Sequence, residues 1–456
     1  MLGARAAPCL MPLWAQKELA GWGRVLRATG AAARPERVAD LERIFADASN
    51  GSLLAYGAGR SYGDAALNSG GRSVIMRRLD RFLEFDPASG RLVAESGATF
   101  GEVIAAFLPR GYLVPVAPGT GFATLGGGIA NDVHGKNHHQ AGSLGQHLEW
   151  FDLRLPSGEL RRVDPAHETE LFRATLGGVG LTGIIERLCL QLKPVPSNSV
   201  VVRKKRIRDL DAYLEAFAEE RDRAEYVVGW IDALAAGRHL GRGVLEAATL
   251  STQDVPASPA KALRLPANMP AFALHAVSVR AFNQLYYSRV PSGGLEYRQA
   301  IGKFLFPLDR LHDWNRIYGK RGFHQFQCVV PFEQGRAALG AMLELTSKSG
   351  HGSFLAVLKA MGPAGVGYLS FPMPGYTLAL DFPNAPGATE LIAQLERIAS
   401  DHGGRIYLAK DSTLSPERLR TMYKALGRFR EVLAAVDPHG RMQSDLARRL
   451  RLRENA

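Results

Sequence analysis

The chain has 456 residues, of which 46% are hydrophobic and 22% charged, and its formal net charge is +12. This length exceeds one ordinary hydrophobic core and predicts two domains, while the lack of any apolar run of about 18 residues argues against a membrane-spanning helix. The basic charge favours contact with phosphates or anionic membranes. Nucleic acid is not expected as a partner, because no nucleic-acid-binding motif accompanies the one tight internal basic cluster, at residues 203–206.

Three cysteines, Cys9, Cys189 and Cys328, are scattered without the spacing of a disulfide framework or a metal site. They predict a reduced, cytoplasmic compartment, and no metal is expected. The apolar stretch at residues 6–14 is interrupted by prolines and lacks the charged-then-apolar order of a signal peptide. We therefore expect no signal peptide there.

The first half of the chain alternates short strands with brief helices. Apolar runs predict a helix at residues 100–108 and strands at 52–56, 91–96, 149–155 and 182–192. Glycines at nearly every junction are typical of a compact α+β domain around an extended ligand. The proline-containing segment at 193–197 predicts a domain boundary.

Two glycine-rich segments in this half each follow a predicted strand. The first reads AYGAGRSYGD at residues 55–64, and the second reads PGTGFATLGGGIANDVHGKN at 118–137. Bare backbone N–H groups at a strand end can cradle a pyrophosphate, so the two segments predict a dinucleotide site. The glycine spacing of the first segment misses the Rossmann pattern by one residue, so a Rossmann unit is not expected.

Beyond residue 197 strands and helices continue to alternate. The predicted elements are helices from Leu210 and around 337–345 and 391–398, and strands at 200–206, 226–232, 324–330, 353–359, 376–382 and 405–409. They indicate a second α+β domain, in which helices cover one face of a sheet. The stretch at 247–294 has little periodicity and is expected to be an irregular insertion.

From about Thr413 the chain is basic and expected to be helical. Arginines flank Leu446, Leu450 and Leu452, which leaves open an amphipathic membrane tail at the end of the chain.

Several side chains stand out, each with an ordinary structural alternative. His134, His138 and His139 lie on one loop without a carboxylate or cysteine partner, so we expect His134 to face a cofactor rather than a metal. Gln325 and Gln327 are two apart on a predicted strand and therefore share a face, which could equally be solvated. Lys410 follows a predicted strand, where a lysine is usually a surface charge.

Seven motifs follow one another along the chain: GWGR at 21–24, GRSYGD at 59–64, HGKNHH at 134–139, GGVGLTGII at 177–185, FPLD at 306–309, YLAKDS at 407–412 and VDPHGRMQSDLARRL at 436–450. Together they resemble the FAD-dependent oxidases of the vanillyl-alcohol-oxidase type, and within them the decaprenylphosphoryl-β-D-ribose 2′-oxidase family. The resemblance runs nearly end to end. It implies a two-domain α+β fold with the main part of a discontinuous FAD domain at 1–196, a substrate domain at 197–409, and a segment at 410–456 that returns to the FAD domain.

The resemblance also implies bound FAD and its contacts. The expected cofactor contacts are Ala55, Tyr56, Gly57, Ala58, Gly59, Arg60, Ser61, Tyr62, Gly63, Asp64, Ala65, Gly119, Thr124, Leu125, Gly126, Gly127, Asn131, Asp132, Val133, His134, Ile185 and Tyr407. Many relatives in the wider superfamily attach the flavin through a histidine at the position of Arg60. Because an arginine cannot form that bond, FAD is expected to be held non-covalently.

At the reaction site the resemblance places Lys410, Gln327, Tyr62, His134, Gln325 and Lys359. Lys410 would orient the substrate hydroxyl, stabilise its alkoxide or accept its proton. The chain departs from the family at Ala379, where some members have a cysteine, and at Leu305, where an aromatic residue is expected.

The implied activity is oxidation of the 2-hydroxyl of a polyprenylphosphoryl-β-D-ribose to the 2-keto sugar, the first half of an epimerisation to the arabinose donor of cell-wall arabinan. A separate NAD(P)H-dependent keto-reductase would complete the epimerisation, and the lipid-linked sugar phosphate implies peripheral contact with the anionic inner membrane. An alditol or aldonolactone oxidase acting on a soluble sugar is the alternative. A non-enzymatic phosphoglycan-binding protein is a remote one.

Overall fold

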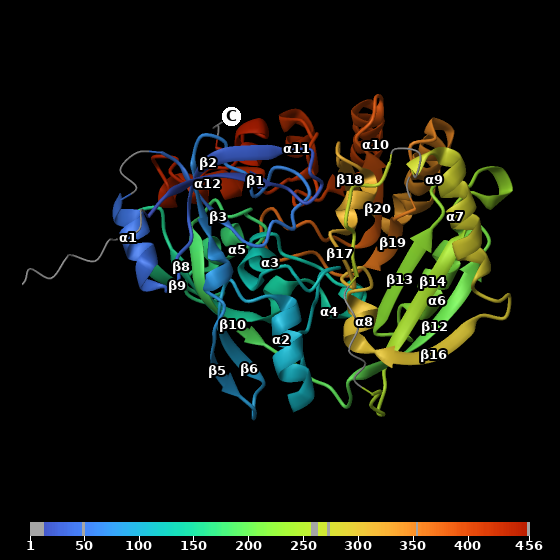
Figure 1. Cartoon of the computed structure of the whole chain (residues 1–456), viewed down its shortest axis with the longest axis horizontal. Coiled ribbons are helices and arrows are strands. Elements are labelled where there is room, and N and C mark those ends of the chain that lie inside the picture. Colours follow the sequence, from blue (N-terminus) through green and yellow to red (C-terminus); the bar gives the residue numbers. More distant parts are fainter. Residues whose placement is uncertain (1–12, 48–50, 257–262, 271–273, 353, 454–456) are drawn as a thin grey trace, which may run out of the picture.

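The computed structural model describes residues 13–47, 51–256, 263–270, 274–352 and 354–453. These residues form sheets of four, five and eight strands with helices packed against them (Figure 1). Two short ribbons complete the strands, β7 (Tyr112–Leu113) with β11 (Lys193–Pro194), and β15 (Leu263–Arg264) with β17 (Leu311–His312). The predicted α+β class is confirmed.

The four-stranded sheet has the order β1-β2-β4-β3 and carries the first glycine-rich segment at the end of β3. Its strands are β1 (Ala15–Ala20), β2 (Arg27–Ala33), β3 (Leu53–Tyr56) and β4 (Arg72–Ile75). Helix α1 (Ala39–Asp47) buries Leu41 and Ile44 in the core that this sheet shares with Met442. The C-terminal part of the chain therefore closes the first core.

The five-stranded sheet has the order β5-β6-β10-β8-β9. Its strands are β5 (Phe82–Asp86), β6 (Arg91–Glu95), β8 (Leu148–Arg154), β9 (Leu160–Val163) and β10 (Ile184–Gln191), with α2 (Phe100–Phe107), α3 (Leu125–Ala130), α4 (His138–Ala141) and α5 (Thr169–Thr175) around it. A capping box between Thr99 and Glu102 fixes the start of α2. The predicted strands and helix of this half are confirmed to within about two residues.

The eight-stranded sheet has the order β16-β12-β14-β13-β19-β20-β18-β21. Its strands are β12 (Ser199–Ile207), β13 (Tyr226–Ile231), β14 (Gly243–Leu250), β16 (Leu295–Ala300), β18 (Phe323–Val330), β19 (Ala356–Met361), β20 (Gly375–Pro383) and β21 (Arg405–Ile406). On one face lie α6 (Leu210–Glu220), α9 (Phe332–Ser349) and α10 (Ala388–Asp401), whose apolar residues share a core with Leu358 and Leu378. The short helix α8 (Ile301–Leu305) follows β16.

The prediction of an irregular insertion at 247–294 is wrong for part of the described residues. Strand β14 continues to Leu250, and residues 276–288 form helix α7 (Ala276–Ser288). This helix packs on the face of the sheet opposite α6, with the rings of Tyr286 and Trp230 4.6 Å apart, so the helices do not cover one face only. Only Val279 and Asn283 of α7 are buried, which is too few for a visible helical period. Residues 257–262 and 271–273 of the predicted insertion lie outside the described residues.

The strand predicted at 405–409 ends early. Strand β21 pairs with β18 only at Ile406 and Arg405, and the next four residues form a turn in which the Lys410 N–H donates to the Tyr407 carbonyl over 2.9 Å. Lys410 therefore lies at the end of a turn rather than directly at a strand end. The strand predicted at 353–359 is shifted to β19, and residue 353 lies outside the described residues.

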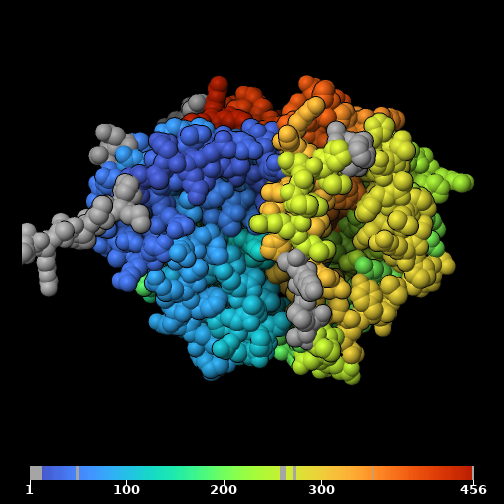
Figure 2. Space-filling model, viewed as in Figure 1, coloured from blue at the N-terminus to red at the C-terminus, as the bar shows by residue number. Residues whose placement is uncertain are grey.

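The C-terminal segment is helical, as expected, with α11 (Pro416–Met422), α12 (Leu426–Val436) and α13 (Asp445–Arg449). Figures 1 and 2 show this red segment lying along the blue N-terminal half. Leu446, Leu450 and Leu452 are fully buried, so the alternative of an amphipathic membrane tail is wrong. Among the described residues no helix combines the length and the hydrophobicity needed to cross a bilayer.

All strands of the eight-stranded sheet come from residues 199–406. The division of the chain at residues 196 and 409 remains a prediction. The apolar stretch at 6–14 lies mostly outside the described residues, as does Cys9, while Cys189 and Cys328 are buried free thiols.

Candidate active site

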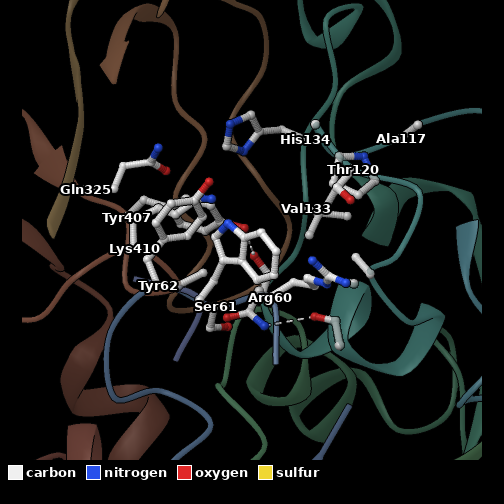
Figure 3. A pocket seen from close by; sticks show the side chains of 18 of the residues that line it. Arg60, Ser61, Tyr62, Ala117, Thr120, Val133, His134, Gln325, Tyr407 and Lys410 are labelled. Carbon is white, nitrogen blue, oxygen red and sulfur yellow. Dashed lines mark hydrogen bonds between the residues drawn. The ribbon is translucent and has the colours of Figure 1, made fainter. Parts of the chain in front are cut away.

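A cavity of about 570 Å³ lies between the two glycine-rich segments and the eight-stranded sheet (Figure 3). The first segment contributes residues 57–62 to its wall, and the second contributes most of residues 117–136. Strands β13, β18, β19 and β20 line the opposite side, and the turn at Tyr407 and Lys410 closes one end. The cavity therefore joins parts of the chain that are far apart in sequence.

The first glycine-rich loop is fixed directly against the turn that carries Lys410. The Tyr62 N–H donates to the Ala409 carbonyl over 3.0 Å. Gly63 must be glycine, because an added Cβ would lie 1.7 Å from the Asp411 carbonyl oxygen. The backbone of the predicted FAD loop and the predicted catalytic turn thus share one rigid contact.

Arg60, at the position of the linking histidine in many relatives, is stacked between two aromatic rings. Its guanidinium carbon lies 4.1 Å from the ring centre of Trp22 and 4.7 Å from that of Phe122. Burial lowers the pKa of Arg60, and Asp309 opposes this shift. Its Nε is buried without a hydrogen-bond partner among the described residues. Arg60, which lines the cavity, therefore has an N–H donor that no described protein group uses.

The second glycine-rich segment has two further buried polar atoms without a partner among the described residues, Asn131 Oδ1 and His134 Nδ1. Thr124 caps α3 by accepting from the Gly127 N–H, and the Asn131 amide donates to the Gly127 carbonyl, which leaves Asn131 Oδ1 without a partner in the described chain. Burial, followed by the charge of Lys359, lowers the pKa of His134 well below its usual value. The ring is therefore neutral near pH 7.

The tautomer of His134 follows from its contact with Gln327. Gln327 Nε2 lies 3.1 Å from His134 Nε2, and since an amide nitrogen only donates, the imidazole Nε2 accepts. His134 Nδ1 then carries the hydrogen, and it is buried without a partner among the described residues. Donors at Arg60 and His134 and an acceptor at Asn131, all on cavity-lining residues, fit a long ligand with both acceptors and donors, as FAD is.

The structure brings most of the predicted cofactor contacts to the cavity wall but not all. Those that line it are Ala55, Gly57, Ala58, Gly59, Arg60, Ser61, Tyr62, Ala65, Gly119, Thr124, Gly126, Gly127, Asn131, Val133, His134, Ile185 and Tyr407. Tyr56, Gly63, Asp64, Leu125 and Asp132 lie behind the wall. The Asp132 carboxylate, for example, is buried and accepts hydrogen bonds from Ser143, Ser370 and the Gly145 N–H.

All six predicted reaction-site residues line the cavity, and Lys410 is packed against another of them, Tyr62. Its Nζ lies 3.6 Å from the centre of the Tyr62 ring. Burial lowers the pKa of Lys410 to about 7, with Asp381 opposing this shift and Lys359 adding to it. Neutral amine is therefore available near pH 7, as proton transfer from a hydroxyl would require.

Behind Lys410 lies a polar group that the sequence analysis missed. Gln325 Nε2 donates to Asp381 Oδ1 over 2.6 Å, and the Tyr318 hydroxyl donates to Asp381 Oδ2 over 2.9 Å. Burial raises the pKa of Asp381 to about 7. The alternation of β20 could have revealed Asp381, because it shares a face with Ala379, which lines the cavity.

Two more buried lysines line the cavity. Lys359 lies on β19, and burial together with the charge of Lys136 lowers its pKa to about 7. Lys136, from the HGKNHH motif, was missed by the sequence analysis; its Nζ lies 4.2 Å from the Phe304 ring centre, and burial lowers its pKa to about 8. An anionic ligand between these two buried lysines would stabilise their charged forms and raise both pKa values.

The three histidines of this motif have separate partners. The Gly362 N–H donates to His138 Nδ1, and His139 Nε2 lies 2.9 Å from the Ala224 carbonyl oxygen. Only His134 of the three lines the cavity. In the part of the chain that the structure describes, no cluster of three or more potential metal ligands occurs.

Two family models match parts of the chain. The FAD binding domain matches residues 29–164, which include both glycine-rich segments, and the D-arabinono-1,4-lactone oxidase family matches residues 380–450 around Lys410. The FAD binding domain match confirms the predicted cofactor and the predicted vanillyl-alcohol-oxidase-type fold.

Several characterised and uncharacterised relatives resemble the chain. Over 453 residues it is 36% identical to the decaprenylphosphoryl-beta-D-ribose oxidase of Mycolicibacterium smegmatis, covering 96% of this chain and 98% of that protein. It is 34% identical over 363 residues to an uncharacterised protein of Streptomyces coelicolor, covering 76% of this chain and 97% of that protein. The human Delta(24)-sterol reductase is 29% identical over 153 residues, which is 33% of this chain and 29% of that protein. The chain is an FAD-dependent oxidoreductase and belongs to the decaprenylphosphoryl-β-D-ribose oxidase family.

Proposed function

We propose that this enzyme oxidises the 2-hydroxyl of a polyprenylphosphoryl-β-D-ribose to the 2-keto sugar. The observation that carries the proposal is a buried lysine of lowered pKa, Lys410, in a cavity wall that also holds Gln325, Gln327 and a pair of cations. The near full-length similarity to an enzyme named for this substrate supports it.

The residues around Lys410 suit the oxidation of an alcohol. When bound, FAD supplies the acceptor for the two electrons and the hydrogen removed from the carbon. Lys410 Nζ, in its neutral form, would accept the hydroxyl proton, and the Tyr62 ring beneath it would hold the amine in place and stabilise the resulting cation.

The amides would orient the sugar. Gln325 donates its nitrogen to the Asp381 carboxylate, so its carbonyl oxygen remains to accept a hydrogen bond from a sugar hydroxyl. Gln327 similarly uses its nitrogen on Thr377 and His134. We propose that both glutamines present acceptors to the substrate and that Asp381 is a positioning residue for Gln325.

We propose further that Lys359 and Lys136 stabilise the phosphate of the substrate. Burial disfavours the charged form of both lysines, unlike that of a surface lysine. An anion between the two ammonium groups would offset this cost of burial for both. A soluble, uncharged sugar would leave Lys359 without an anionic partner and Lys136 with the charge of Glu246 alone.

A second candidate is an oxidase of a soluble sugar, such as an aldonolactone, because residues 380–450 match the D-arabinono-1,4-lactone oxidase family. One experiment separates the two. Anaerobic bleaching of the flavin absorbance would be followed with farnesylphosphoryl-β-D-ribose, free ribose, ribitol and D-arabinono-1,4-lactone. Faster bleaching by the phosphoryl ribose supports the proposal, whereas equal or faster bleaching by ribitol or the lactone favours the second candidate.

A keto-reductase partner and peripheral contact with the cytoplasmic side of the inner membrane complete the proposal. The net charge of +12 and the exposed apolar side chains of Leu263, Val277 and Leu285 support the membrane contact. The protein should then co-sediment with phosphatidylglycerol vesicles at low salt and be released at high salt. Binding to neutral phosphatidylcholine vesicles alone would contradict it.

A further inference from the structure

The cavity extends beyond Lys410 and the glutamines into an apolar arm. Its walls are formed by Val228 and Trp230 of β13, Val357 of β19, Phe354, and Phe282 and Tyr286 of α7. Apart from the Tyr hydroxyl and the Trp N–H, these side chains offer only apolar and aromatic surface. One charged residue, Glu246 of β14, lies opposite Val228 and also lines the cavity, and its carboxylate is paired with Lys204 Nζ. The Trp230 N–H is already used, since it donates to the Phe354 carbonyl over 2.8 Å.

The strand register connects this arm to the polar end. Gln327 of β18 lies opposite Ala379 of β20, Ala379 lies opposite Val357 of β19, and Val357 lies opposite Trp230 of β13. These four residues form one row across the sheet, and all four line the cavity. Lys359 is two residues from Val357 on the same face of β19, in the neighbouring row, where it lies opposite Thr377.

The arm lies outside the part of the chain that matches the FAD binding domain. That match covers residues 29–164, whereas every residue of the arm comes from α7, the eight-stranded sheet or the segment before β19.

Helix α7 sets where the arm meets the surface. The helix is attached through Asn283, whose amide donates to Asp232 Oδ1 over 2.7 Å, and through the contact of Tyr286 with Trp230. Phe282 lies one turn before Tyr286, packs 5.3 Å from the Phe354 ring, and is 43% exposed. Because Phe282 lines the cavity and is also exposed, the arm opens beside α7.

We propose that this arm binds the first isoprene units of the lipid chain of the substrate. The proposal rests on the function proposed above and adds the site of the lipid to it. A sugar at Lys410 and a phosphate at Lys359 would direct the attached chain along the row toward Trp230. The chain would then run along the Phe282 and Phe354 rings, which pack against each other, and leave the protein beside α7.

The test measures binding, so that it does not depend on turnover. Isothermal titration calorimetry of the FAD-loaded enzyme would compare farnesyl phosphate with ethyl phosphate, in wild type, Phe282→Gln and Leu285→Gln. Both substitutions are at exposed positions of the same helix, but only Phe282 lines the cavity. We expect farnesyl phosphate to bind wild type and Leu285→Gln more tightly than ethyl phosphate, and Phe282→Gln to lose about tenfold of that preference.

Equal affinities of the two phosphates in wild type would overturn the proposal, as would equal losses in the two variants. Failure of the proposed function is seen separately, as the absence of flavin bleaching by the phosphoryl ribose. Unfolding of Phe282→Gln would not confuse the result, because its affinity for ethyl phosphate is an internal control and is expected to stay unchanged.

Discussion

The Nζ of Lys410 lies 3.6 Å from the centre of the Tyr62 ring, although the two residues belong to opposite ends of the chain. The backbone holds them together, because the Tyr62 N–H donates to the Ala409 carbonyl and Gly63 contacts the Asp411 carbonyl. The loop expected to hold FAD and the lysine expected to act on the substrate therefore have a fixed relative position. Such preorganisation is what catalysis by positioned groups requires.

Replacement of Lys410 should remove the chemical step and leave the cofactor in place. For Lys410→Ala we expect an unchanged flavin spectrum and a rate of anaerobic flavin reduction lower by about 10²- to 10⁴-fold, because proton transfer from the hydroxyl loses its acceptor. Lys424→Ala is the matched control, since Lys424 is an exposed lysine of the same C-terminal segment. Single-turnover reduction at the wild-type rate would remove Lys410 from the mechanism.

The rate of flavin reduction should rise with pH through about 7. Burial lowers the pKa of Lys410 to about 7, so below that pH the amine is protonated and cannot accept a proton. The rate should fall by about tenfold for each pH unit below 7 and level off above it. Stopped-flow measurements of flavin reduction by wild type between about pH 5.5 and pH 9, a range that spans this pKa, test the predicted rise. Lys410→Ala should not show it. A rate that falls as pH increases through 7 would mean that the cation is the active form.

Arg449 should contribute strongly to stability. Its guanidinium donates to both oxygens of Asp64 and to Asp411 Oδ2, and so ties the first glycine-rich loop to the residue after Lys410. Arg449→Ala leaves two buried carboxylates without their cation, so the free energy of unfolding at pH 8 should fall by about 3–5 kcal/mol.

Chemical denaturation with urea measures this loss, and Arg420→Ala, at an exposed position of α11, is the control. Burial raises the pKa of Asp64, so acidification neutralises its carboxylate and should reduce the cost of losing Arg449. A loss of stability equal to that of Arg420→Ala, or one that grows toward low pH, would contradict this assignment.

FAD should be bound without a covalent link. The position of the linking histidine is Arg60, whose guanidinium is stacked on Trp22 and Phe122 and cannot form the covalent bond that a histidine forms. Precipitation with trichloroacetic acid should release all of the yellow colour into the supernatant. Flavin that stays with the precipitated protein would contradict the prediction.

The sequence predicted those features that depend on local pattern. Strands such as β10 and β18, with their apolar runs, and the glycine-rich segments were located correctly, because period and turn residues act over a few positions. Helix α7 was missed because it is held by tertiary contacts without a sequence period, among them the Asn283 amide to Asp232 and the aromatic pairs of Tyr286 with Trp230 and of Phe282 with Phe354. Its exposed face resembles a loop in composition.

In the candidate site, too, the features set by local sequence were predicted and those set by tertiary contacts were not. Lys410 was assigned through a motif, and Gln325 and Gln327 through strand alternation and the family resemblance. Asp381 and Lys136 were missed, since their importance comes from burial and from neighbours on other strands. Asp132 and Asp64 were expected to contact FAD through the family resemblance; their carboxylates bind Ser143 and Arg449, and a contact of their backbones with FAD stays a prediction. Position within a motif does not determine the direction of a side chain.

The most direct test of the account is the position at which the sugar is oxidised. The FAD-loaded enzyme would be reacted anaerobically with one equivalent of farnesylphosphoryl-β-D-ribose, and the product would be reduced with borodeuteride and analysed by mass spectrometry after hydrolysis. The account predicts stoichiometric flavin bleaching and deuterium at C2 of the recovered ribose and arabinose. Deuterium at any other carbon, or no bleaching by this substrate while ribitol bleaches the flavin, would contradict it.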